Sequence, residues 1–422
     1  MSAEAEKLRI YDRADNKGWK KWGPYLSDRA WGTVREDYSP YGDAWNFVSH
    51  DMARSKAYRW GEEGIGGISD NKGHICFALA FWNHRDNILK ERFFGLTGPE
   101  GNHGEDVKEL YYYLDSTPTH AYMKMLYKYP QAEFPYNKLV IETMRRSRQE
   151  PEYEIQDTGI FDQNEYFDIV IEYAKADQND WLVTVTAHNR GSIDAPLTLL
   201  PTLWFRNTWS WGYEQYSVRP MLTGIATNQI EVNHRQLGKY KLYCDGADEL
   251  LFCENETNTE RLYGRPNVTP YPKDAINNYI ITGRPEFVNP NRIGTKASAR
   301  YTRNVPAGGS VCIRLRFSDQ THLPDPFGDF DAHFALRKAE ADEFYDDLQA
   351  AALTGPNASP DLVNIQRQAY AGMLWSKQFY YYNVNEWLKG DPNMPVPFQG
   401  RVYARNETWR HMYTANILSM SR

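Results

Sequence analysis

Strand-like segments follow one another almost without interruption from about residue 74 to residue 318. In residues 166–176, YFDIVIEYAKA, the side chains of Phe167, Ile169 and Ile171 fall on one face, as in a half-buried strand. Turn-forming sequences, such as PAGG at 306–309, separate neighbouring segments. Long antiparallel strands at this density predict a mainly β protein with a large antiparallel β-sandwich.

The aromatic content agrees with this prediction. The chain contains 30 Tyr, 18 Phe and 13 Trp, and aromatic side chains favour pleated, half-buried surfaces. Tyr and Trp also offer a flat face with a polar edge, which suits carbohydrate rings, although a large β-core accounts for most of them without a ligand. The segments expected to be strands are 74–83, 107–118, 119–130, 166–176, 180–191, 195–209, 239–246, 249–255, 278–283 and the two halves of 296–319 around PAGG.

The pattern becomes helical after residue 323. Residues 324–353 carry apolar side chains at roughly helical spacing, and residues 358–383 open with Ser-Pro-Asp, a helix-starting sequence. From 383 to 405 the chain is loop-like, with several prolines. The apolar residues that define the helical spacing are Phe334, Leu336, Ala339, Phe344 and Leu348 in the first segment and Leu362, Ile365, Ala369, Met373 and Leu374 in the second.

Charge and cysteine usage exclude several classes of protein. The net charge is −7 and no basic block stands out, so we expect no nucleic-acid partner. No apolar run is long enough to cross a bilayer, and the N-terminus lacks an apolar signal core, so we expect no membrane association. The four cysteines are scattered and none lies in a CxxC pair, which indicates reduced thiols and a cytoplasmic location.

Known cofactor and nucleophile motifs are not found in the sequence. His103, in the polar stretch PEGNHGEDVKE, is the nearest approach to a metal ligand, but no second cluster matches it, which favours an ordinary loop histidine. There is no P-loop and no GxSxG, and the GIGG at 64–67 lacks the context of a dinucleotide site. We therefore expect neither a metal nor another cofactor.

Paired carboxylates are the plausible catalytic chemistry. Inverting hydrolysis of a glycosidic bond needs one protonated acid and one ionised base that face each other across the sugar. Residues adjacent in sequence seldom face each other in this way, so solvated surface is the favoured interpretation for each pair. The adjacent pairs in polar surroundings are Glu36 with Asp37, Glu62 with Glu63, and Glu105 with Asp106.

Several long segments resemble one known family. The chain is similar to the cytosolic, microbial-type glucosidases of glycoside hydrolase family 63, the family of mannosyl-oligosaccharide glucosidase. The resemblance covers nearly the entire chain. The segments that carry it are WGPYLSDRAWGTVREDYSPYGDAWNF, RSKAYRWGEEGIGGISD, LKERFFGLTGPEGNHGEDVKELYYYLDSTPTHAYMKMLYKYPQ, LLPTLWFRNTWSWG, AYAGMLWSKQFYYYNV and NETWRHMYTANILSMSR.

The resemblance implies a domain order. An N-terminal β-supersandwich is expected at 1–322, a helical linker at 323–357, and the start of a truncated (α/α)6 barrel at 358–422. In the family the barrel continues well beyond the point that matches Arg422 and carries the catalytic acids. Twelve helices of about 11–15 residues do not fit after residue 355. We therefore expect the catalytic barrel half to be missing, no catalytic residue within the chain, and an oligosaccharide hydrolase that is inactive or nearly so alone.

The resemblance also suggests substrate-side residues. In the family a loop from the sandwich can approach the cleft, which makes Trp31, Arg35, Glu36 and Tyr38 candidates for contact with the substrate. Packing between the two domains also selects Trp, Tyr and Arg, and we favour this packing role slightly. Ends of barrel helices face the cleft, so residues at the end of the first barrel helix are a second set. This second set is Trp375, Lys377, Gln378 and Tyr381.

Two further functions stay open. The chain could be a non-catalytic carbohydrate-binding or scaffolding domain, because the aromatic sandwich is intact. It could also be a gene-model fragment, for which we expect exposed apolar side chains on 360–382, where a barrel helix has lost its partners.

Overall fold

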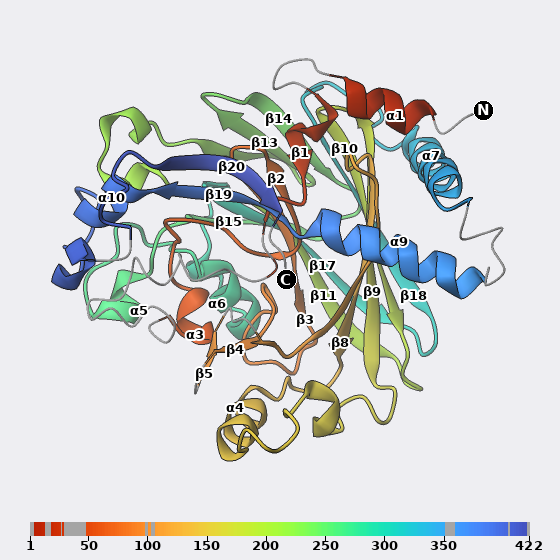
Figure 1. Ribbon diagram of the computed structural model, residues 1–422, viewed down its shortest axis with the longest axis horizontal. Coiled ribbons are helices and arrows are strands. Elements are labelled where there is room, and N and C mark those ends of the chain that lie inside the picture. Colours follow the sequence, from red (N-terminus) through yellow and green to blue (C-terminus); the bar gives the residue numbers. More distant parts are fainter. Residues whose placement is uncertain are drawn as a thin grey trace.

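The computed structural model describes residues 4–12, 18–26, 28, 48–97, 100–102, 106–350, 359–403 and 406–419. In this part of the chain the protein is mainly β, and a nine-stranded and a six-stranded antiparallel sheet face each other as a sandwich (Figure 1). The nine-stranded sheet has the order β16 (Ile293–Gly294), β12 (Met221–Ala226), β13 (Gln229–His234), β14 (Gly238–Cys244), β18 (Ser310–Ser318), β10 (Asp180–Asn189), β9 (Tyr166–Asp177), β8 (Tyr122–Pro130) and β7 (Leu110–Ser116). The six-stranded sheet has the order β1 (Trp22–Gly23), β2 (Ile65–Asp70), β3 (Ile75–Trp82), β11 (Ala195–Phe205), β17 (Lys296–Val305) and β15 (Glu249–Cys253).

The core lies between these two sheets. Alternation along β10 points Val183 and Val185 inward, where they are fully buried. Rings from both sheets meet there: the Phe77 ring of β3 lies 5.2 Å from the Trp181 ring of β10, and Trp181 stacks on Phe317 of β18 at 4.7 Å. The alternation in the sequence therefore sets which face of each strand enters the core.

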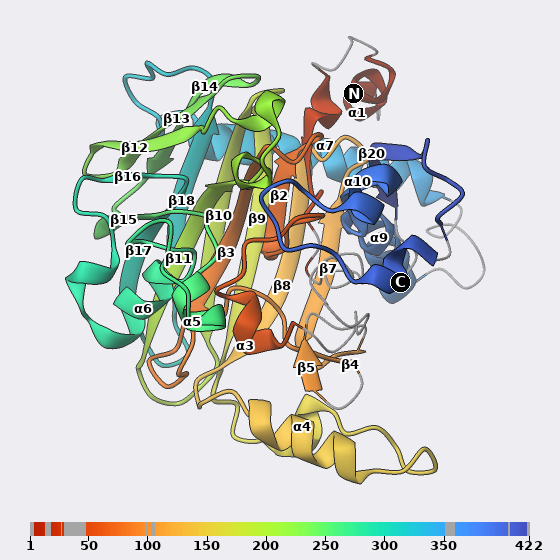
Figure 2. The same cartoon turned by 90° about the vertical axis from the view of Figure 1, so that its left-hand side faces the viewer.

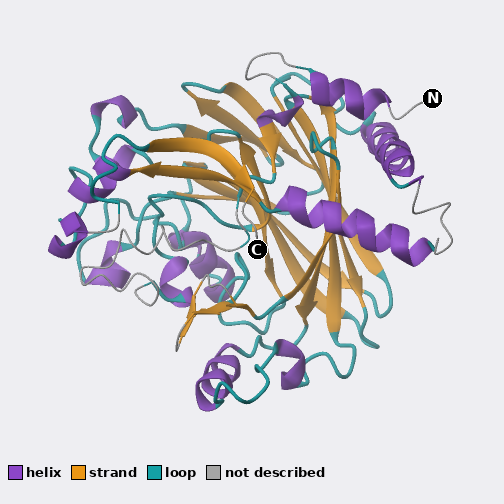
Figure 3. Ribbon diagram, viewed as in Figure 1, coloured by secondary structure: helices purple, strands orange, loops and turns teal. Residues whose placement is uncertain are grey.

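Most of the expected strands are confirmed, as the orange ribbons of Figure 3 show, but 278–283 is not a strand. This segment belongs to helix α6 (Ala275–Thr282), which ends at Gly283 in a left-handed conformation. Ile276 and Ile280 are four residues apart and pack together on the outer face of the six-stranded sheet. The prediction was wrong because a short apolar run fits either period when its packing surface is unknown.

Three helices pack at the nine-stranded sheet: α1 (Glu4–Tyr11) contacts α7 (Phe330–Leu348), α7 lies on β9, and α9 (Pro360–Trp375) lies on β7 (Figure 2). The helix expected within 324–353 is present as α7, but its apolar spacing does not mark the face that contacts the sheet, because Leu336 and Leu348 are exposed. The helix instead buries Ala341, Tyr345 and Arg337, and the Arg337 guanidinium donates to the Lys175 carbonyl oxygen. The apolar spacing indicates a helix here, but it does not identify the residues that pack on the sheet.

The second helix also differs from its expected form. It ends at Trp375, and residues Lys377–Asn383 form strand β19, which pairs with β20 (Tyr413–Ser419). The aromatic run FYYY favours a strand once a partner is present. Ala371 and Trp375 are the buried residues of α9, whereas Leu362, Ile365 and Met373 are exposed.

Smaller elements complete the described chain. Helix α10 (Val384–Lys389) follows β19 directly, and Asn383 caps it by accepting from two backbone N–H groups. The division of the chain at residues 322 and 357 stays a prediction. No helix within the described ranges is both long and apolar enough to span a membrane. The remaining α-helices and strands are β4 (Gly95–Thr97), β5 (Glu100–Asn102), β6 (Asp106–Val107), α3 (His50–Ala53), α4 (Tyr136–Arg145) and α5 (Thr259–Tyr263).

Candidate functional site

The first set of sequence-predicted site residues lies outside the described residues: Trp31, Arg35, Glu36 and Tyr38. Asp37 and Glu105, each a member of an adjacent carboxylate pair, also lie outside the described residues, and so does His103, the nearest approach to a metal ligand. The expectation that the loop approaches a cleft therefore stays a prediction.

The structure separates the second set instead of gathering it at a helix end. Trp375 is buried against the sandwich, where its ring stacks on Tyr113 at 5.3 Å and its Nε1 donates to the Asp115 carbonyl oxygen. Lys377, Gln378 and Tyr381 lie on β19. Because side chains alternate along a strand, Gln378 points away from the face that Lys377 and Tyr381 share.

Lys377 belongs to a buried basic group. Its Nζ lies 3.3 Å from Nε2 of His120, and burial together with Lys20 lowers the pKa of Lys377 to about 8. Burial also lowers the pKa of Lys175 to about 7, and the Lys175 ammonium donates to the carbonyl oxygens of Trp19, Trp22 and Thr119. These contacts tie β19 and the N-terminal segment to the sandwich, which is a structural role.

Tyr381 reaches a cluster of arginines and aromatic rings. Its ring lies 5.7 Å from Trp60 and 6.1 Å from Trp211, and the Arg59 guanidinium lies between these rings, 4.1 Å from Trp60 and 3.5 Å from Trp211. Cation–π contacts of this kind are strongest where water is excluded. The cluster joins three parts of the chain: β19, the segment before β2, and the loop after β11.

Two carboxylates neutralise Arg59. Its Nη2 donates to Asp391 Oδ1 at 2.9 Å and to Glu386 Oε2 at 2.7 Å, and its Nε donates to Asp391 Oδ2. The contact with Asp391 is bidentate, the geometry that fixes both planar groups. Sequence reasoning missed these residues, although Arg59 lies in the quoted segment RSKAYRWGEEGIGGISD.

Arg206 lacks such carboxylates. Its guanidinium lies 4.9 Å from the Tyr381 ring and 5.1 Å from the Phe379 ring, and among the described residues no carboxylate forms an ion pair with it. Burial, followed by the charge of Arg59, lowers the pKa of Arg206. The rings thus stabilise a desolvated cation without a counter-ion in the described part of the chain.

Glu62 and Glu63 enter a different group, a buried ion network on the outer face of the six-stranded sheet. Glu63 accepts from Arg92 Nε at 2.9 Å and from the Tyr58 hydroxyl, while Glu62 accepts from Asn255 Nδ2 at 3.2 Å. Glu91 accepts from Lys296 Nζ at 2.8 Å. Glu62 and Glu63 are therefore neither solvated surface residues nor a pair that faces each other across a ligand, because each acid has its own partners.

The surroundings of the network shift the pKa values of its acids in different directions. Burial raises the pKa of Glu62, although Lys273 and hydrogen bonds from Trp204 and Asn255 oppose the shift. Burial also acts to raise the pKa of Glu91, but Lys296 and Arg92 outweigh it and lower that pKa to about 2. Burial lowers the pKa of Lys273 to about 8. Such divergence is typical of active sites and of structural ion networks alike.

Cavity size decides between these roles. The cavity within the network has a volume of about 30 Å³, room for water and not for a sugar ring. Three larger cavities lined by described residues, of about 270 to 690 Å³, each have a single carboxylate in their lining: Asp391, Glu260 and Asp51. These cavities do not supply the two opposed acids that hydrolysis requires.

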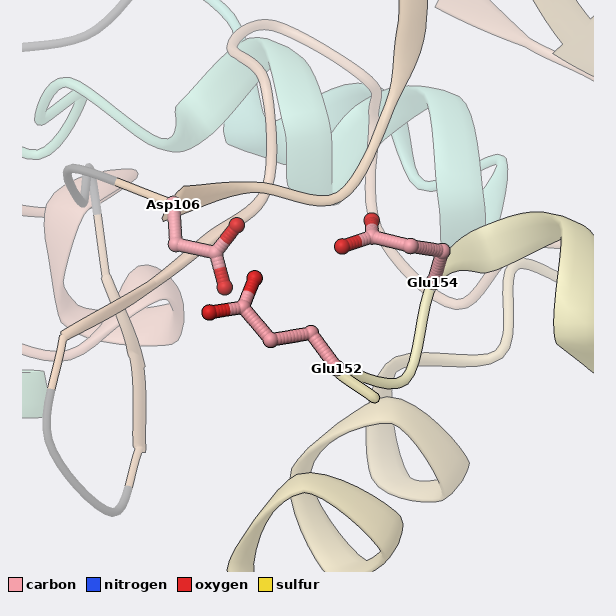
Figure 4. A group of neighbouring side chains, drawn as sticks. All are labelled: Asp106, Glu152 and Glu154. Carbon is pink, nitrogen blue, oxygen red and sulfur yellow. The ribbon is translucent and has the colours of Figure 1, made fainter. Parts of the chain in front are cut away.

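One further acidic group could attract a cation. Ligand atoms of Asp106, Glu152 and Glu154 lie within 4.8 Å of one another, and Figure 4 shows the three side chains pointing toward a common space. The Lys108 ammonium, however, lies 2.7 Å from Asp106 and 2.8 Å from Glu154. A lysine therefore already supplies positive charge to this group.

The comparisons give a relative rather than a family. No protein-family model matches the chain. The chain is 41% identical over 464 aligned residues to an uncharacterized protein of Saccharomyces cerevisiae, YMR196W, and the match covers 99% of this chain and 42% of the yeast protein. The chain thus spans less than half the length of this relative.

Among solved structures, the chain is similar to a putative kojibiose phosphorylase from the human microbiome. The sequence identity is 11%, the TM-score is 0.22, and the match covers 78% of this chain and 35% of that chain. A TM-score of this size supports no inference about function.

Proposed function

We propose that the chain forms the β-sandwich part of an α-glucosidase of the glycoside hydrolase family 63 type and is inactive or nearly so on its own. The support is the family resemblance of the long sequence segments together with the small number of carboxylates in the larger cavities. In this proposal α7 belongs to the linker at 323–357, and α9 is the first helix of a barrel that begins at residue 358. The protein is cytoplasmic and acts on oligosaccharides.

The observation that carries the proposal is the exposed apolar face of α9. Ile365 and Met373 are 57% and 58% exposed, and Leu362 on the same helix is also exposed. An amphipathic helix normally buries such residues, so this face requires a covering partner. The yeast relative is more than twice as long as the aligned region, which provides a source for one.

The mechanism assigns different tasks to the two parts. A carboxylic acid protonates the leaving oxygen while an opposed carboxylate activates water, and both groups come from the covering barrel. The sandwich supports the barrel and contributes substrate-side residues. The proposed contributors are Trp31, Arg35, Glu36, Tyr38, Lys377, Gln378 and Tyr381, whereas the burial of Trp375 supports a role in packing.

The test compares the 422-residue chain alone with the chain co-expressed with a polypeptide equivalent to the unmatched part of the yeast relative. We expect hydrolysis of an aryl α-glucoside only by the pair, and we expect NMR spectra of the product to show inversion at the anomeric carbon. Hydrolysis by the chain alone that is lost on mutating one of its own acids would show that the proposal is wrong. So would a stable pair that hydrolyses no α-glucoside or α-linked oligosaccharide.

The exposed residues of α9 also fit the alternative of a gene-model fragment. Aggregation of the isolated chain, with no gain in solubility when the second polypeptide is present, would favour that alternative.

A further inference from the structure

Strand β20 lies at the edge of a two-stranded sheet, and part of its backbone faces outward. Its register with β19 places Ile417 opposite Phe379. The Phe379 N–H donates to the Tyr25 carbonyl oxygen at 2.9 Å, away from β20, so this opposed pair is one that exchanges no backbone hydrogen bonds. The backbone N–H and C=O of Ile417 therefore point away from β19.

The same alternation holds at the start of the strand. The Val384 N–H donates to the Met412 carbonyl oxygen at 3.2 Å, so the bonded pairs contain the even-numbered residues of this segment. Ala415, like Ile417, then turns its backbone groups outward. In the described part of the chain, no hydrogen bond reaches the backbone N–H or C=O of Ala415 or of Ile417. These groups form a template for one further strand.

The sequence of β20 lacks the features that usually protect such an edge. YTANILS contains no charged residue and no proline. Leu418 within the strand and Trp409 before it are 36% and 56% exposed. By contrast, β1 and β16 are two residues long, and β7 carries an irregularity between Tyr113 and Asp115 and lies under α9. The edge of β20 is thus one that another chain can extend.

The surroundings of this edge indicate its occupant. Helix α9 ends at Trp375, and β19 begins at Lys377, which pairs with Ser419 of β20. The edge is therefore joined to the helix whose apolar face is exposed, and both elements lie on the same side of the molecule (Figure 2). The yeast relative has more than half of its length outside the aligned region, which provides a second polypeptide for this side.

A second copy of the chain is a weaker candidate for the occupant. Two copies that pair through β20 alone would join two strands of seven residues each. Such a contact buries less surface than a stable dimer needs.

We propose that a strand of the polypeptide equivalent to the unmatched part of the yeast relative adds to the outer edge of β20, with its backbone bonded to Ala415 and Ile417. The inference rests on the proposed function, which identifies the partner. Main-chain hydrogen bonds provide the affinity in this mode of recognition, and the uncharged side chains of β20 favour an uncharged partner strand.

Hydrogen exchange of the 422-residue chain, alone and in complex with the second polypeptide, tests the strand addition. We expect the amides of Ala415 and Ile417 to exchange slower by about tenfold or more in the complex, because they acquire acceptors. The amides of Asn416 and Leu418 are the internal control, since they already face β19 and should change less.

A pair of variants at one position separates the backbone from the side chain. Ile417→Pro removes an outward N–H, and proline is tolerated at a strand edge. It should weaken association by about tenfold in calorimetric titration, whereas Ile417→Ala, which keeps the N–H, should stay within about threefold of wild type. Thermal midpoints show whether each variant folds, and exchange in the wild-type chain decides the question if Ile417→Pro does not.

Equal affinity of the two folded variants overturns the inference, as does a complex in which Ala415 and Ile417 exchange as they do in the chain alone. Absence of any complex overturns it as well. Protection of these amides that grows with the concentration of the chain alone would identify a second copy as the occupant and would also overturn it. An active pair with unprotected amides would leave the proposed function standing. Protected amides in a pair that hydrolyses no α-glucoside or α-linked oligosaccharide would overturn the proposed function only.

Discussion

At the scale of single residues, the protein places charges where a β-sandwich usually has apolar side chains. Glu62, Glu63 and Glu91 are stabilised by Arg92, Lys273 and Lys296 on the outer face of one sheet. Buried ion pairs add little net stability over apolar packing, but removing one partner is costly. The network therefore fixes the geometry of this face more than it stabilises the whole fold.

Glu91→Gln measures the strength of one such pair. The pKa of Glu91 falls from the ordinary 4.5 to about 2, which corresponds to about 3 kcal/mol at neutral pH. A lowered carboxyl pKa stabilises the folded state above the unfolded pKa, and this contribution is lost as the pH falls from 4.5 through 2. We expect urea unfolding at pH 7 to show a free energy of unfolding about 3 kcal/mol lower in Glu91→Gln than in wild type. This difference should shrink below pH 4.5. A backbone hydrogen bond and Arg284 also lower the pKa of Glu286, so Glu286→Gln should show a pH dependence of the same sign but smaller, because solvent screens this exposed carboxylate; an equal effect in both variants would contradict the assignment.

At the scale of elements, packing chose between helix and strand where the sequence was ambiguous. Residues 275–282 became a helix because Ile276 and Ile280 both meet the outer sheet face. Residues 377–383 became a strand because β20 pairs with them along their whole length. Short apolar or aromatic segments fit either conformation until the partner surface is known.

Two glycines test local packing in opposite directions. A Cβ at Gly372, in α9, meets no atom within 4 Å, so Gly372→Ala should raise the free energy of unfolding by about 0.5–1 kcal/mol through helix propensity. A Cβ at Gly294 would lie 2.2 Å from the Cys253 carbonyl oxygen, and Gly294→Ala should lower that free energy by about 1–3 kcal/mol. Thermal and urea denaturation measure both changes, and stabilisation by Gly294→Ala would show that this backbone contact is wrong.

At the scale of the whole molecule, the sandwich has a closed core and an open side. Rings and aliphatic side chains from both large sheets form one cluster, whereas α9 and the segment after it expose apolar residues. A described chain with a complete core and one uncovered helix face is suited to carrying a further domain.

A double variant, Ile365→Glu with Met373→Glu, tests whether that face is an interface. Both side chains are exposed, so we expect the free energy of unfolding of the isolated chain to change by less than about 0.5 kcal/mol. Binding of an apolar dye should fall, and association with the second polypeptide should be lost in size-exclusion chromatography. Trp375→Ala on the buried face should instead cost about 3–5 kcal/mol. Retained association in the double variant would contradict the interface.

The amino-acid sequence by itself determined the mainly β architecture, because alternation of period two and turn residues between segments specify strands locally. It also predicted a helix at 324–353 and the helix that begins with Ser-Pro-Asp. Only the tertiary structure decided that Arg337 and not Leu336 faces the sheet, and that Arg59, Asp391 and Trp211 meet around one cavity. These residues lie far apart in the chain, and contacts between distant segments follow from the packing of whole elements rather than from local pattern.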